Sequence, residues 1–358
     1  MKASPSQPHP AEWTETQDLL PSVARDLPAG RHRFHKEQMM TQIHQDLRTT
    51  RTDSRPAVAL RHRNPFLRRA VLLPAAAFGL AGAVVAGVAL SGGDGGGGKT
   101  ALATGPALTT RVGAVDAEGA PKMLDRISLA AADVSEPTPH AGQFVYIASK
   151  VDSTYPRTID DKTTVVSRGL HSRQVWNSPD GKQGWLIEPG ETSDKGMTLS
   201  SDTPLDSAYD ALAELPTDPA LLLRRIYRDS DAVRDHEVPR DQAAFVAIGD
   251  LLSESYPPAG LAAALYKAAA RIPGVVAVDD AVDAVGRHGV AIARQDDTAG
   301  ERTEWIFDKK TLKFLGERNV VVKKVAGSPF KVGTVTFTSA ITQRAVVDAA
   351  KQVPGRVG

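Results

Sequence analysis

The chain contains no cysteine among its 358 residues. This absence excludes disulfide bonds, lipid-modified cysteines and the thiolate ligands of zinc sites. Any folded part must therefore be stabilised by its hydrophobic core, and a segment of about 220 residues is long enough to build one. Apolar residues make up 41% of the chain and charged residues 24%, which are ordinary globular values and argue against disorder of the whole chain.

The chain also lacks the short motifs of common enzyme classes. There is no G-x-S-x-G elbow and no H-E-x-x-H zinc motif, and His236-Glu237 has no second histidine at the required spacing. Adjacent aspartates on a strand, as at 279–280 and 296–297, point to opposite faces and cannot share one substrate atom. We therefore expect no enzyme activity, no catalytic residue, no metal and no cofactor. The histidines of this part of the chain are scattered: His140, His171, His236 and His288.

Residues 93–100, GDGGGGKT, match the phosphate-binding pattern G-x-x-x-x-G-K-[ST]. That loop must follow a buried strand and open a helix, whereas this one follows an apolar segment and precedes ALATGPALTT. We interpret it as a flexible glycine tether. We expect neither nucleotide nor nucleic acid as a partner.

One long apolar run is present, Ala70–Leu90, and its 21 residues reach roughly 30 Å as a helix. The run predicts a single transmembrane helix. Arginines gather on its N-terminal side, so the positive-inside rule places residues 1–69 in the cytoplasm and the C-terminal part outside the cell membrane. A signal peptide cleaved near Ala89 is the alternative, but the leading region is too long for one. The flanking arginines are Arg61, Arg63, Arg68 and Arg69.

Two further features belong to this predicted span. Residues 1–69 carry 12 Lys and Arg against 7 Asp and Glu, so they are attracted to anionic membrane lipids. Gly79, Ala83 and Gly87 form a stripe of small residues that permits close helix pairing. Chance in an alanine-rich segment is the alternative explanation of the stripe.

The tail 1–69 is rich in proline and polar residues, so we predict that most of it is disordered. Arg31–Leu47 is the exception and predicts a short amphipathic helix. Such a helix binds a partner, lies on a bilayer or orders only in part. Nearby histidines lack the cysteines or carboxylates of a metal site. The residues predicted to bind a partner are Phe34, Met40, Ile43 and Leu47.

Beyond the span we predict a Gly-rich tether over 91–120 and an α+β domain over 121–358. Alternation and turn residues predict strands before residue 190 and again after residue 275, with alanine-rich helices between them. Asp218 and Pro219 are typical of a helix start. This order indicates an antiparallel sheet covered by helices on one face. Hairpin turns are expected at Ser178–Gly181 and Asp308–Thr311.

The strand sequences FVYIASKV at 144–151 and GTVTFTSAI at 333–341 alternate apolar residues. They could line a concave cleft that holds an apolar ligand, either a lipid or a peptide, or they could simply meet the helices as core. The same alternatives apply to Trp176, Trp185 and Trp305, for which the sheet core is the first interpretation and a ligand platform the second.

Four segments, RDLPAGRHRFHKEQMMTQI, LPTDPALLLRRIY, RIPGVVAVDDAVDAVGRHGVAI and EWIFDKKTLKFLGER, resemble an actinobacterial family of uncharacterised single-pass membrane proteins. The resemblance implies an outer domain similar to the half-barrel of lipoprotein carriers. Genes of this family commonly lie beside those of extracytoplasmic-function sigma factors, which implies a regulatory partner for the tail. The resemblance assigns no catalytic or ligand-binding residue.

Two hypotheses follow. In the first, the outer domain senses the envelope and the tail binds a cytoplasmic partner such as a sigma factor, so the chain acts in signal transduction. In the second, the chain is an anchored envelope carrier or binding module for lipids or lipoproteins, and the tail is dispensable.

Overall fold

The computed structural model describes residues 104–159 and 162–355. Twelve strands in these residues form one sheet, and each hydrogen-bonded pair of strands is antiparallel. The main order is β2-β8-β9-β10-β11-β12-β3-β5-β6-β7, and β4 pairs with β3 and β1. The strands are β1 (Gly105–Pro106), β2 (Val115–Asp116), β3 (Phe144–Ile159), β4 (Lys162–Ser167), β5 (His171–Asn177), β6 (Gln183–Ile187), β7 (Met197–Ser200), β8 (Val275–Val282), β9 (His288–Asp296), β10 (Glu301–Asp308), β11 (Phe314–Val321) and β12 (Val335–Val347).

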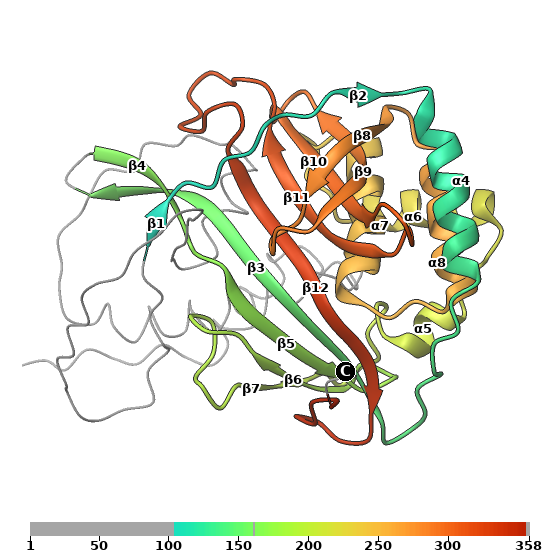
Figure 1. The fold of residues 1–358 in the computed structure, drawn as a ribbon. Helices are drawn as coiled ribbons and strands as arrows, with labels where there is room; N and C mark the ends of the chain where they lie inside the picture. Colours follow the sequence, from blue (N-terminus) through green and yellow to red (C-terminus); the bar gives the residue numbers. More distant parts are fainter. Residues whose placement is uncertain (1–103, 160–161, 356–358) are drawn as a thin grey trace, which may run out of the picture.

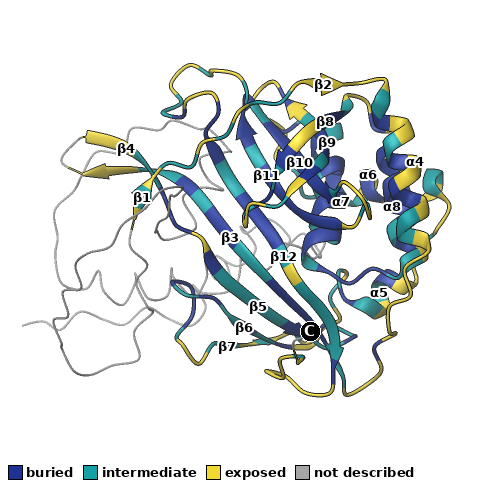
Figure 2. Ribbon diagram, viewed as in Figure 1, coloured by how far each residue is buried: buried dark blue, intermediate teal, exposed yellow. Residues whose placement is uncertain are grey.

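Helices cover one face of this sheet (Figure 1). Phe245 of the helix layer stacks on Trp305 of β10 with ring centroids 3.8 Å apart, and Tyr266 meets Phe307 of β10 edge-on. All four rings are buried, so the boundary between helices and sheet is the main core. Figure 2 shows buried residues on the helix sides that face the strands. The helices of the described part are α4 (Gly119–Ala132), α5 (Tyr209–Ala213), α6 (Pro219–Asp231), α7 (Arg240–Glu254) and α8 (Ala259–Ala269).

The opposite face of the sheet is covered in part by residues 104–118, which we call the outer strap. In Figure 1 this teal segment runs from β1 past β12 and β11 to β2. The amide of Val335 donates to the carbonyl of Leu108 over 2.9 Å. Beneath the strap, Glu304 accepts hydrogen bonds of 2.7 Å from both Arg302 and Arg318.

The two arginines also reach the strap itself. Arg302 donates to the carbonyl of Gly113 over 3.1 Å, and Arg318 donates to the hydroxyl of Thr110 over 3.2 Å. Arg302, Glu304 and Arg318 are all buried, so the triad joins the strap to β10 and β11. Residues 104–118 lie within the range predicted as a tether, and in the structure they pair with the sheet at both β1 and β2.

The predicted architecture with a transmembrane helix is wrong for the residues the structure describes. The antiparallel sheet dominates them, and none of their helices is long and apolar enough to cross a membrane. The longest, α7, has 15 residues, which span about 22 Å against a hydrocarbon core of about 30 Å. The predicted span Ala70–Leu90 lies outside the described residues. The predicted localisation was a cell membrane, with a cytoplasmic N-terminus and an outer C-terminal domain. It is corrected because no helix among the described residues could span a membrane.

Candidate functional site

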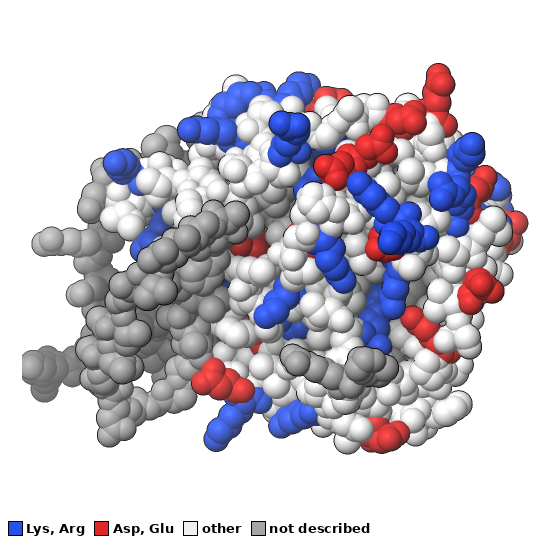
Figure 3. Space-filling model, viewed as in Figure 1, with Lys and Arg blue, Asp and Glu red and all other residues white. Residues whose placement is uncertain are grey.

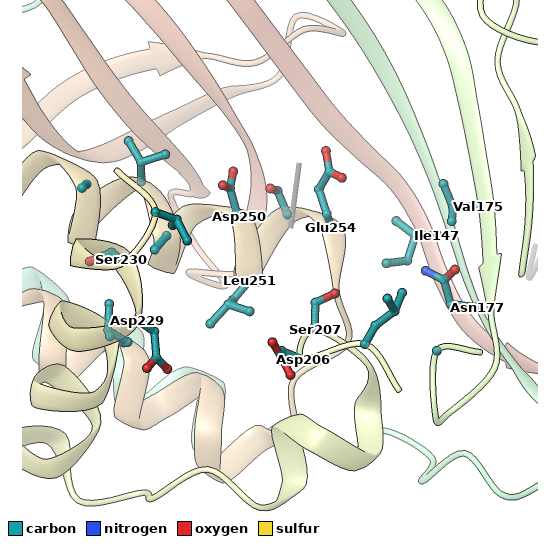
Figure 4. A pocket seen from close by; sticks show the side chains of 18 of the residues that line it. Ile147, Val175, Asn177, Asp206, Ser207, Asp229, Ser230, Asp250, Leu251 and Glu254 are labelled. Atoms are coloured by element: carbon teal, nitrogen blue, oxygen red, sulfur yellow. The ribbon is translucent and has the colours of Figure 1, made fainter. Parts of the chain in front are cut away.

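An apolar cavity of about 440 Å³ lies between the sheet and the helices α6 and α7. Because side chains on a strand alternate between faces, every second residue of the middle parts of β3 and β12 points into it. Figure 4 shows Ile147 and Val175 on the strands opposite Leu251 of α7. The lining residues from the two central strands are Ile147, Ser149 and Val151 of β3, and Phe337, Ser339 and Ile341 of β12.

The helices supply the second wall of the cavity, and α6 starts where its sequence requires. Asp218 caps α6 by accepting hydrogen bonds of 2.9 and 2.8 Å from the amides of Ala220 and Leu221, and Pro219 opens the first turn. This start directs Leu222 and other apolar residues of α6 toward the sheet. The apolar lining from the two helices comprises Leu222 and Ile226 of α6, and Ala243, Val246, Ala247 and Leu251 of α7.

One end of the cavity is closed by two loops in close contact. Gly181 lies in the turn between β5 and β6 with a φ of 69°, and a Cβ atom there would lie 2.7 Å from the Cβ of Leu205. The amide of Leu205 donates to the carbonyl of Asp180 over 3.2 Å. A glycine is therefore needed for the loop of Leu205, Asp206 and Ser207 to pack against this turn.

Arg173 is the charged residue that β5 contributes to the cavity. Its Nη1 donates to Glu188 Oε2 over 2.5 Å, and its Nη2 lies 3.5 Å from Glu254 Oε2 of α7. Glu188 also faces His171, whose Nε2 lies 3.1 Å from Glu188 Oε1. Burial alone would raise the pKa of Glu188, but Arg173, His171 and Arg168 outweigh it and lower the pKa to about 2. Glu188 is therefore a carboxylate that holds Arg173 in place.

A buried polar cluster supports this end of β5. Asp152 accepts from the hydroxyl of Ser167 over 2.9 Å and from the amide of Gly169 over 2.6 Å, and burial raises its pKa. Arg168 forms a buried ion pair with Glu191. Because these groups satisfy one another away from the cavity, we assign them a structural role.

The cavity is lined by both signs of charge, with acidic residues slightly in excess. Arg225 pairs with Asp229 on α6, and Arg234, which follows this helix, donates to Asp231 over 2.8 Å. Figure 4 shows Asp250 and Glu254 on α7 and Asp206 on the loop that closes one end. The charged lining residues are Arg173, Arg225, Arg234, Asp206, Asp229, Asp250 and Glu254.

The two strand sequences proposed to line a cleft do line this cavity. Trp176 and Trp305 are fully buried, as expected for core residues, and the Lys351 ammonium lies over the Trp185 ring at 3.5 Å. His171 and His288 each face a carboxylate, Glu188 and Asp280 respectively.

All of the predicted partner, flanking and helix-pairing residues lie outside the described residues. They are Phe34, Met40, Ile43, Leu47, Arg61, Arg63, Arg68, Arg69, Gly79, Ala83 and Gly87. The tail's role in binding a regulatory partner or anionic lipids therefore stays a prediction.

Arg173, Glu188 and Glu254 were not identified from the sequence. A signal was present for Arg173, because the alternation in HSRQVWN places this arginine on the same face as Val175. Nothing in the sequence pairs β5 with the end of α7, so the partner Glu254 could not be found this way.

No protein-family model, curated protein or solved structure matches this chain. The resemblance to an actinobacterial membrane family therefore stays a prediction.

Proposed function

We propose that the described domain is a binding module that holds the apolar part of a lipid-like small molecule in the cavity between its sheet and its helices. The observation that carries this proposal is the cavity itself, which has apolar side chains on both walls beside its charged ones and a volume of about 440 Å³. Ligand sites in proteins are commonly apolar cavities of about 300–1,000 Å³ with a few polar groups.

The surface gives less support to a charged macromolecule as the ligand. On the face shown in Figure 3, acidic and basic side chains are interspersed over both sheet and helices. A nucleic-acid partner is typically met by a basic patch or stripe. The apolar interior is the more specific feature of this domain.

The proposal is tested by filling the cavity. Leu251 is partly buried and faces the cavity, so Leu251→Trp occupies ligand space, whereas Leu129→Trp adds the same side chain at a position that is 67% exposed on α4. We expect Leu251→Trp to weaken the binding of a fluorescent acyl-chain probe by at least about tenfold. Leu129→Trp should leave the affinity unchanged.

Circular dichroism and thermal melting establish that both variants are folded. If Leu251→Trp fails to fold, Val246→Phe fills the same cavity from α7 with a smaller change in volume. Probe binding of wild-type strength in a folded, cavity-filled variant would contradict the proposal, as would the absence of probe binding by the wild-type chain.

A further inference from the structure

We propose that the outer face of the sheet carries a binding site for a small organic ammonium ion, and that Lys351 occupies this site in the structure. The site is a row of three aromatic side chains, Tyr146, Trp176 and Trp185, which we call the aromatic row. It is independent of the proposed function, because Trp176 follows the cavity-lining Val175 on β5 and therefore points to the opposite face of the sheet.

Strand pairing places the three aromatic side chains on one face of neighbouring strands. Tyr146 of β3 lies directly opposite Trp176 of β5, which in turn lies opposite Trp185 of β6, and directly opposed residues share a face. The rings of Tyr146 and Trp176 have centroids 4.9 Å apart. Both of these residues are buried, whereas Trp185 is only partly buried. The aromatic row therefore ends in one partly accessible indole.

The C-terminal segment 348–355 covers part of the aromatic row. The indole Nε1 of Trp176 donates to the carbonyl of Gln352 over 2.7 Å, and the Lys351 ammonium lies over the Trp185 ring, 3.5 Å from its centroid. The face of an indole carries partial negative charge and attracts a cation more strongly than other aromatic side chains do. Among the described residues, Lys351 forms no ion pair with an acidic side chain, so the Trp185 ring is the group that binds its charge.

The backbone holds Lys351 in this position against its preference. Its φ is 69°, in the left-handed region that lysine rarely adopts, and such a conformation persists only where neighbouring contacts maintain it. These contacts lie at the surface: residues 348–353 are all exposed, and so are the hydrogen bonds of 2.9 Å that join Asp348 to Gln143 and to Gln352. Lys351 can therefore leave the ring without disturbing the main core between the sheet and the helices.

The chemistry of the aromatic row selects the class of ligand. A methylated ammonium group combines a positive charge with an apolar surface, and the faces of Trp and Tyr rings are the groups that recognise it. An anion would be repelled by these faces, and a neutral alkyl group would lack the electrostatic attraction. The place to be filled is that of one lysine ammonium, so the ligand is a small alkylammonium ion, for which choline is the probe.

The inference is tested by comparing choline with 3,3-dimethylbutan-1-ol, in which carbon replaces the charged nitrogen, on the full chain at equal ionic strength. Saturation-transfer NMR on the methyl protons measures the binding of each compound. Because Lys351→Ala removes the resident ammonium, we expect this variant to bind choline about threefold more tightly than the wild-type chain does. The alcohol should bind at least about threefold more weakly than choline. Equal affinities for the two compounds, or no gain from Lys351→Ala, would overturn the inference.

Two further variants assign the effect to the residues. Lys310→Ala removes an exposed lysine in the turn between β10 and β11, so it is the matched control and should bind choline as the wild-type chain does. Trp185→Leu should abolish the preference for choline, because it removes the ring and keeps an apolar side chain. If Trp185→Leu fails to fold by circular dichroism, Trp185→Phe should weaken choline binding, since a phenyl face attracts a cation less strongly. Choline binding of wild-type strength in the folded variant would contradict the assignment.

A cavity-filling variant separates this inference from the proposed function. Leu251→Trp, or Val246→Phe in its place, should weaken the acyl-chain probe and leave choline binding unchanged, because the cavity lies on the other face of the sheet. Loss of choline binding in this variant would place the cation in the cavity and overturn the inference. If the wild-type chain binds choline but not the acyl-chain probe, the proposed function is wrong and the ammonium site stands.

Discussion

Single side chains set the ends of the elements that form the cavity, and Asp218 is the clearest case. Its carboxylate accepts hydrogen bonds from two amides of the first turn of α6. We expect Asp218→Ala to lower the free energy of unfolding by about 1 kcal/mol, because these amides lose their partner. Urea denaturation measures the change, and Glu214→Ala, an exposed position just after α5, should change stability by less than about 0.5 kcal/mol.

Glu188 makes stability depend on pH at the acidic end. Its pKa falls from 4.5 to about 2 on folding, so the unfolded chain binds the proton more tightly. The stabilisation is therefore complete above about pH 5 and is lost as the pH falls toward 2, which amounts to about 3 kcal/mol. Urea titrations at several pH values should show this slope in the wild-type chain. The slope should be smaller in Glu188→Gln and unchanged in Glu237→Gln; equal slopes in all three chains would contradict the assignment.

At the scale of elements, α7 lies close to the sheet because it carries a glycine where it crosses β10. A Cβ atom on Gly249 would lie 2.5 Å from Trp305 Nε1, whereas a Cβ atom on Gly260 of α8 would meet nothing within 4 Å. The two glycines thus differ in surroundings although both lie in helices.

Alanine at these two positions should have opposite effects. Gly260→Ala should stabilise the chain by up to about 1 kcal/mol through helix propensity. Gly249→Ala should destabilise it by about 1–3 kcal/mol, because Trp305 must move from its stack on Phe245. Thermal melts with Trp fluorescence measure both, and stabilisation by Gly249→Ala would show that α7 does not approach β10 this closely.

Strong local signals predicted where one helix begins and where one hairpin turns. The Asp218-Pro219 start of α6 and the turn at Asp308, which accepts from the amides of Lys310 and Thr311, are confirmed. β7 was missed because it has four residues, and the part of β12 beyond Ile341 was missed because Gln343 and Arg344 interrupt its apolar pattern. Their strand conformation comes from pairing with neighbouring strands, which no local pattern contains.

At the scale of the whole molecule, the outer strap depends on a buried ionic triad. Glu304 is fully buried between Arg302 and Arg318, and both arginines reach the strap. Glu304→Ala leaves two buried guanidinium groups without their counter-ion, so we expect a loss of about 3–5 kcal/mol. Replacing all three residues together by Met, Leu and Met should cost much less. Equal losses in the single and the triple variant, measured by urea denaturation, would contradict this account.

At this scale, the sequence predicted part of the cavity lining but not the contacts between distant elements. Alternation identified two of the strands that line the cavity, β3 and β12, because the period of a strand is a local property. The pairing of Arg173 with Glu254 depends on how α7 crosses the sheet, and the arrangement of β12 beside β3 depends on the whole topology. Both are long-range results of packing, so neither could be predicted from one sequence.

The pairing of β3 with β12 affects how the chain folds while the ribosome is still synthesising it. Phe144 of β3 pairs with Val347 of β12, so the partner of one edge of β3 is made about 200 residues later. At a synthesis rate of about 5–20 residues per second, roughly 10–40 s pass before that partner exists. During this interval the growing chain carries an open strand edge beside unfinished core, and strand edges recruit other chains. Because β3 is sixteen residues long, a chaperone that shields this edge would protect the nascent chain from such contacts.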